Sequence, residues 1–160
     1  MKYKDTIKNF EINFDNKKIR KLKDLKGIFM NFNLSEKKIL NEIVYETYTK
    51  KLSPINLTLT ILYPGKINEE FYMTKGHIHK TKTPEFYILI EGKGILLTQK
   101  GNKIKTTNMK RGKIELIYGD WAHRIINTGN KKMKVMTIYH ENSKPDYNIT
   151  FKRRFFANKY

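Results

Sequence analysis

Three of the four histidines and one glutamate are spaced in a way that could build a metal site. His77 and His79 lie two residues apart, so a strand would place both imidazoles on one face. Glu85 begins the next strand-like run, and His123 follows much later. Three neutral imidazoles and one carboxylate suit Fe2+, Mn2+, Ni2+, Co2+ or Zn2+ and leave positions free for a chelating substrate. The pattern predicts metal binding, with structural or surface histidines as the alternative.

Short strands with glycine turns are expected around these residues. From residue 55 the apolar period changes to two, as Leu57 and Leu59 alternate with threonines. A hairpin is expected around Gly101-Asn102. The other expected strands are the run after Glu85, a strand pair within 111–130, and the run 133–140. This succession predicts an all-β fold, either a β-barrel or a jelly roll.

A helix is expected before the region of period two. Ser35 can cap it, and its apolar stripe consists of Ile39, Leu40, Ile43 and Val44. We therefore predict one helix near 35–48, followed by a break at Pro54. The chain of 160 residues suits a single domain, 1–160. Its expected parts are an N-terminal extension (1–53), a β-barrel core (55–142) and a basic C-terminal segment (143–160).

The composition excludes several classes of protein. Apolar residues make up 39% and charged residues 30%, which is typical of a globular chain, and no apolar run approaches the roughly 20 residues of a membrane span. The first 15 residues lack the apolar stretch of a secretory signal, and cysteine is absent. We therefore expect a cytoplasmic protein that is not embedded in a membrane.

A formal net charge of +18 asks for an explanation. Such a charge can serve nucleic acid, an anionic surface or a small anionic ligand. The lysines are scattered, apart from clusters such as 17–23 and 152–156, so we interpret the charge first as a bias of composition. A field for an anionic substrate is the second interpretation, and nucleic acid is the least favoured partner.

Two stretches resemble the motifs of the cupin family. The first runs from Gly76 through the histidine pair and Glu85 to Gly92, and the second contains Gly112, His123 and Asn127. Longer stretches, "PGKINEEFYMTKGHIH", "EFYILIEGKGILLTQ", "DWAHRIINTGN" and "IYHENSKPDY", are similar to the archaeal, cupin-type glucose-6-phosphate isomerases over roughly residues 20–147. Two departures from the common cupin pattern are the longer interval between His79 and Glu85 and the turn 118–120, where Gly119 is the expected pivot.

The resemblance implies a cupin jelly roll with an N-terminal strand and helix extension. It also implies a metal held by His77, His79, Glu85 and His123, with Fe2+ as the favoured ion and Glu85 and His77 as catalytic groups. The implied contacts to substrate or phosphate are Thr60, Thr74, Gly76, Tyr87, Tyr139 and Tyr45. The implied partners are a phosphorylated hexose and a second copy of the chain in a homodimer.

The implied activity is a metal-dependent interconversion of glucose 6-phosphate and fructose 6-phosphate. The metal would chelate the oxygens on C1 and C2 while Glu85 moves the proton between these carbons. A hydride shift would use the same ligands, so the sequence leaves both routes open. The alternatives are a cupin dioxygenase, which usually has an apolar pocket, and a non-catalytic sugar-binding cupin. The threonine, lysine and tyrosine residues near the motif favour a polar, anionic ligand.

Overall fold

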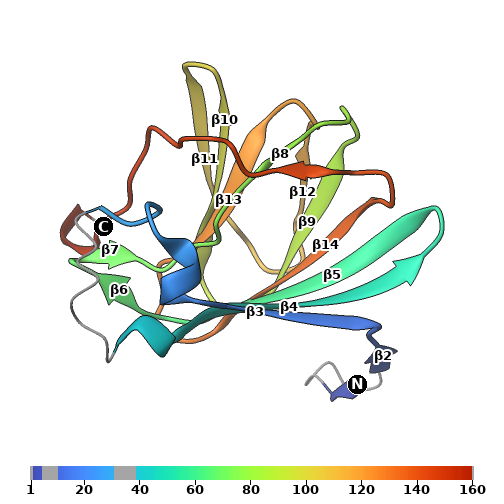
Figure 1. Cartoon of the computed structure of the whole chain (residues 1–160), viewed down its shortest axis with the longest axis horizontal. Helices are drawn as coiled ribbons and strands as arrows, with labels where there is room; N and C mark the ends of the chain where they lie inside the picture. Colours follow the sequence, from blue (N-terminus) through green and yellow to red (C-terminus); the bar gives the residue numbers. More distant parts are fainter. Residues whose placement is uncertain (1, 5–10, 31–38, 160) are drawn as a thin grey trace.

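The computed structural model describes residues 2–4, 11–30 and 39–159. Its larger sheet contains β3 (Asn16–Lys21), β4 (Ile43–Leu52), β5 (Ile55–Leu62), β9 (Glu85–Glu91), β12 (Ile114–Ile117) and β14 (Met133–His140). These strands are antiparallel in the order β12-β9-β14-β5-β4-β3. A smaller sheet, β11-β10-β13, consists of β10 (Gly94–Lys100), β11 (Lys103–Asn108) and β13 (Ala122–Asn127) (Figure 1).

The remaining elements are short. The strands among them are β1 (Lys2–Lys4), β2 (Glu11–Asn13), β6 (Lys66–Ile67), β7 (Glu70–Phe71), β8 (Ile78–His79) and β15 (Pro145–Asp146). The 3-10 helices are η1 (Leu22–Leu25), η2 (Ile39–Asn41) and η3 (Ala157–Lys159). No helix in the described ranges is long and apolar enough to cross a membrane. The prediction of an all-β fold is confirmed.

One buried cluster joins the two sheets. Leu62 and Val135 from the larger sheet lie in it together with Leu97 and Ile125 from the smaller sheet. Two isolated antiparallel bridges, Met73 to Ile126 and His77 to His123, join the segment 73–77 to β13. The sheets therefore close around a common interior, as a barrel requires.

The helix predicted near 35–48 is wrong where the structure describes it. Residues 31–38 lie outside the described part, Ile39–Asn41 form a 3-10 turn, and Ile43–Leu52 form β4. The apolar stripe fitted a helix, but β-branched and aromatic residues such as Val44, Tyr45 and Tyr48 favour a strand. Because β3 and β5 both pair with β4, long-range hydrogen bonds decided between two local patterns.

The prediction that two strands within 111–130 pair with each other is also wrong. Both strands exist, but β12 pairs with β9 and β13 pairs with β10. They therefore belong to different sheets. By contrast, the hairpin around Gly101-Asn102 is confirmed, since Lys100 and Lys103 close β10 and β11 across those two residues.

The C-terminal segment crosses the barrel instead of extending away from it. Its strand β15 pairs with β8, beside the histidine pair. Farther along, the backbone N–H of Phe71 donates to the carbonyl of Phe155, and that of Ala157 donates to Glu69. In Figure 1 this red segment runs over the upper strands and ends near β6 and β7. Through the pairing of β15 with β8, the C-terminal segment can hold the histidine pair in place from outside the barrel.

Candidate functional site

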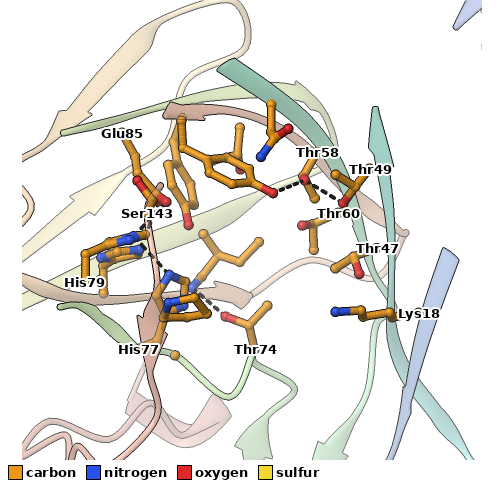
Figure 2. Close-up of a pocket in the computed structure, with 18 of the residues that line it drawn as sticks. Lys18, Thr47, Thr49, Thr58, Thr60, Thr74, His77, His79, Glu85 and Ser143 are labelled. Carbon is orange, nitrogen blue, oxygen red and sulfur yellow. Dashed lines mark hydrogen bonds and ion pairs between the residues drawn. The ribbon is translucent and has the colours of Figure 1, made fainter. Parts of the chain in front are cut away.

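The predicted ligands converge from three neighbouring strands. His77 and His123 exchange two backbone hydrogen bonds of 3.1 and 2.9 Å, which fixes β8 against β13. The Nε2 atoms of His77 and His79 lie 3.2 Å apart. The Glu85 carboxylate lies 2.7 Å from His79 Nε2 and 3.2 Å from His123 Nε2 (Figure 2). All four potential ligand atoms fall within 4.8 Å of one another.

These distances fit a single metal ion. Ligand atoms about 2.1 Å from one ion lie roughly 3 Å apart when they meet at right angles. Moreover, Glu85 Oε2 and His123 Nε2 are buried without a well-formed hydrogen bond, and both point into the cluster. Buried polar atoms are rarely left in this state. The residues present can therefore hold a divalent ion with three nitrogen donors and one oxygen donor.

The electrostatics keep His77 and Glu85 in the form that binds a metal. Burial, aided by repulsion from His123, lowers the pKa of His77 to about 3, so its imidazole is neutral at neutral pH. Burial alone would raise the pKa of Glu85. The close imidazoles of His123 and His79 outweigh burial and hold that pKa well below its usual range. Glu85 is therefore an ionised carboxylate among imidazoles.

His123 is oriented by the backbone next to it. Its Nδ1 lies 3.0 Å from the carbonyl oxygen of Trp121. A carbonyl can only accept, so Nδ1 carries the proton and the lone pair of Nε2 faces the cluster. The Trp121 side chain packs against the barrel core and is not part of the cavity wall.

The cluster lies in a cavity of about 330 Å³. All ten site residues expected from the sequence line this cavity, which brings them together; their individual roles remain predictions. They are Tyr45, Thr60, Thr74, Gly76, His77, His79, Glu85, Tyr87, His123 and Tyr139.

Several further cavity residues were not predicted. They include Lys18, Arg20, Thr47, Thr49, Thr58, Thr137, Ser143 and Tyr147. For the four on β3 and β4 the signal was an alternation of period two, which the predicted helix concealed over most of β4. Tyr147 reaches the site from the C-terminal segment, where its ring lies 5.7 Å from that of His77.

Hydroxyl groups form the wall next to the cluster. The hydroxyl oxygens of Thr49 and Thr58 lie 2.8 Å apart, and Thr58 lies 3.2 Å from the Tyr139 hydroxyl (Figure 2). Tyr87 is buried, and its phenol lies beside Glu85. Burial raises the pKa of Tyr87, so it stays protonated and can donate. Such a wall suits a ligand with many hydroxyls.

A buried stack outside the cavity holds the loop 74–76. Arg124 donates from Nη2 to the carbonyl of Lys75 at 2.9 Å, and its guanidinium lies 3.8 Å from the ring centre of Phe151. The Ile125 N–H donates to Thr74 Oγ1 at 3.2 Å. A Cβ on Gly76 would lie 2.6 Å from the Phe151 ring. The stack thus fixes the loop only while residue 76 is a glycine.

The two departures from the common cupin pattern, the longer interval between His79 and Glu85 and the turn 118–120, pack against each other. The turn 118–120 is closed by the Trp121 N–H, which donates to the Tyr118 carbonyl at 2.9 Å. A Cβ on Gly119 would overlap the backbone of Lys82 and Thr83, within the longer interval between two ligands. Thr83 in turn bonds Ser143 at 2.6 Å. Gly119 therefore provides the space that the longer loop occupies.

Comparison with known sequences gives one consistent result. The profile of the family "Glucose-6-phosphate isomerase (GPI)" matches residues 19–160. A glucose-6-phosphate isomerase of Thermococcus litoralis is 34% identical, over 97% of this chain and 89% of that protein. One from Pyrococcus abyssi is 36% identical, over 86% and 77%. A "Putative glucose-6-phosphate isomerase 2" of Rhizobium meliloti is 27% identical, over 86% and 73%.

Solved structures show the same fold in larger proteins. An oxalate oxidase in complex with glycolate has a TM-score of 0.51 at 15% identity, covering 59% of this chain and 46% of that one. A Bacillus subtilis oxalate decarboxylase with Mn(II) centres has a TM-score of 0.53 at 19% identity, covering 62% and 26%. The chain thus spans less than half the length of either protein, and the likeness concerns the cupin fold alone.

Replacing His79 with alanine should remove bound metal, because one of four donors is lost. We expect affinity to fall by more than the roughly 10- to 100-fold seen when a supporting group is lost. Metal analysis after dialysis measures this. His140→Ala is the matched control, because His140 lies outside the cluster and its ring Nδ1 accepts from the Asn142 N–H. Equal metal content in both variants would refute the ligand assignment.

Replacing Gly76 with alanine should cost more stability than replacing Gly112. Both glycines have φ of 74°, where a side chain costs about 1–2 kcal/mol. Only at Gly76 would the new Cβ also meet Phe151, while the space at Gly112 is open. Denaturant unfolding of the two variants should therefore show a lower midpoint for Gly76→Ala. Equal midpoints would show that Phe151 moves aside at no cost, and would contradict the packing constraint at Gly76.

Proposed function

The chain belongs to the glucose-6-phosphate isomerase family, and from this membership we propose that it interconverts glucose 6-phosphate and fructose 6-phosphate. The observation that supports this most is the meeting of four metal donors with a wall of hydroxyl groups in one cavity. An aldose and a ketose differ only in which of two adjacent carbons carries the carbonyl. A site for their exchange must hold two neighbouring oxygens and move one hydrogen.

The cluster His77, His79, Glu85 and His123 is the proposed metal centre. A divalent ion held there would act as a Lewis acid toward the oxygens on C1 and C2. We propose Fe2+, which the family resemblance favours; the donor set also accommodates Mn2+, Ni2+, Co2+ and Zn2+. A polar, hydroxyl-lined cavity argues against the alternative of a dioxygenase with an apolar substrate.

Glu85 is the proposed base. As an ionised carboxylate it can take the proton from C2 of the open-chain aldose, while the C–H electron pair forms the double bond of an enediol. It then returns the proton to C1, and a hydroxyl proton moves from the oxygen on C2 to that on C1. Atoms and charge balance without an external oxidant. The neutral His77 serves as a ligand beside the reacting oxygens.

The remaining predicted residues are proposed to hold the sugar phosphate. The hydroxyls of Tyr87 and Tyr139 face the sugar carbons from the strands that carry or adjoin Glu85. The hydroxyl groups of Thr60, Thr74 and Tyr45, with the backbone at Gly76, are the proposed contacts of the phosphate end. Hydrogen bonds to groups far from the reaction can orient the reacting carbons.

A homodimer is proposed from the outer face of the larger sheet. Four large apolar residues there are about 40–62% exposed: Phe86, Ile114, Leu116 and Tyr118. Leu116 is the direct cross-strand partner of Phe86, and β12 is the last strand of its sheet. A second copy could cover both this patch and the open strand edge.

The isomerase proposal is tested by turnover of glucose 6-phosphate with chelator and after addition of each of the five ions. We expect activity to require a metal, and Glu85→Gln to lower kcat by roughly 10²- to 10⁴-fold. In D2O the product should gain solvent deuterium if Glu85 moves a proton. Glu115→Gln is the control, because Glu115 is a shielded carboxylate outside the cavity. Turnover by fully metal-free protein would contradict the mechanism.

Replacing Leu116 with glutamate should break the dimer, since a charge would be placed in an apolar contact. Light scattering should then give a mass near 19.1 kDa in place of twice that value. Ile104→Glu is a matched control on β11, because Ile104 is also partly exposed but lies on the other sheet. A native protein that is already monomeric would refute this interface.

A further inference from the structure

Strand β3 presents two cations to the cavity that the proposed function leaves unused. Lys18 and Arg20 both line the cavity, opposite Thr47 and Tyr45 on β4. Strand alternation sends Lys17 to the outer face, where it forms an ion pair of 2.8 Å with Glu46. Lys17 on the outer face of β3 is therefore compensated by a carboxylate.

Neither cavity cation has a carboxylate partner among the residues that the structure describes. Two acidic residues line the cavity. Glu85 belongs to the metal cluster, and Glu141 accepts a hydrogen bond from Ser53. The wall formed by β3 thus carries two positive charges that a bound anion could compensate.

Arg20 meets the loop of the metal motif at one corner of the cavity. The Tyr45 hydroxyl lies beside the Arg20 side chain and also contacts the backbone of Lys75. Burial raises the pKa of Tyr45, so its hydroxyl keeps the proton and can donate. Guanidinium, phenol and the loop of Thr74 and Gly76 therefore come together where several donors can meet one group.

The Lys18 charge lies away from the metal cluster. In Figure 2 the Lys18 ammonium stands across the cavity from His79 and Glu85, on the side lined by the labelled threonines of β4 and β5. A hexose 6-phosphate is divided in the same way, with its reacting carbons far from its charged group. Its reacting carbons are at one end, its hydroxyls are in the middle and a dianion is at the other end.

We propose that Lys18 and Arg20 are specificity-determining residues that anchor the phosphate dianion of the substrate. Arg20 offers a planar fork of donors that matches two phosphate oxygens, and Lys18 adds a point charge. The pair makes the site select phosphorylated over neutral sugars. This inference rests on the proposed function, since it names the charged contacts of the same substrate.

The test measures anion binding separately from turnover. Arg20→Gln, Lys18→Gln and the double variant are titrated with inorganic phosphate and with glucitol 6-phosphate, with unphosphorylated glucitol as the neutral probe. Lys17→Gln is the matched control, because it removes a charge from the outer face of the same strand. Metal content and thermal unfolding show whether each variant remains folded and loaded.

We expect Arg20→Gln to weaken binding of both anions roughly 10- to 100-fold and the double variant to weaken it further. Arg20→Lys should lie in between, because it keeps the charge and loses the fork. Glucitol binding and metal content should not change. The KM for fructose 6-phosphate should rise in the same order.

Two outcomes separate this inference from the proposed function. If the unchanged protein converts no hexose phosphate but the variants still lose phosphate affinity, the isomerase proposal fails and the anion anchor stands. If the variants bind both anions as tightly as Lys17→Gln does, the anchor is refuted even when isomerase activity is present. Failure of the unchanged protein to bind either anion also refutes it.

Discussion

A buried carboxylate among three imidazoles is the interaction on which the structure around the site depends. Glu85 is only 3% exposed, and an isolated charge at such a position would cost many kcal/mol. Its contacts with His79 and His123 compensate that cost only if β8, β9 and β13 come within a few ångströms of one another. Because β9 belongs to the larger sheet and β13 to the smaller, closing the barrel and assembling the donors are the same event.

Because hydroxyl groups line the cavity, apolar side chains of β4 and β5 are buried on the outer face of the sheet. The inner faces of β4 and β5 carry threonines, whereas their outer faces carry Tyr48, Leu59 and Ile61. Phe14, from the segment before β3, packs on this outer cluster. The residues around Phe14 therefore cover apolar side chains that the cavity cannot accept. At the other end of the sheet, Leu116 and its neighbours have no such cover among the described residues.

Glycines and the C-terminal segment fix the loops that carry the donors. Gly119 makes room for the loop that precedes Glu85, and Gly76 makes room for Phe151 from the C-terminal segment. Arg124 connects this packing to the carbonyl of Lys75. Gly119, Phe151 and Arg124 thus hold the rim of the cavity from outside its lining, which is how precise donor geometry is usually maintained.

The sequence by itself determined the donor types, the period of the strands and the hairpin at Gly101, because each depends on residues close together in the chain. Motif spacing also indicated the four metal donors, and the resemblance to the isomerase family implied the other six cavity residues. The sequence did not determine β4, because the stripe from Ile39 to Val44 fits a helix and a strand alike. Nor did it assign Lys18 and Arg20 to the cavity. Only the tertiary structure decided these points: hydrogen bonds from β3 and β5 outweigh local preference, and the pairing register selects which side chains face inward.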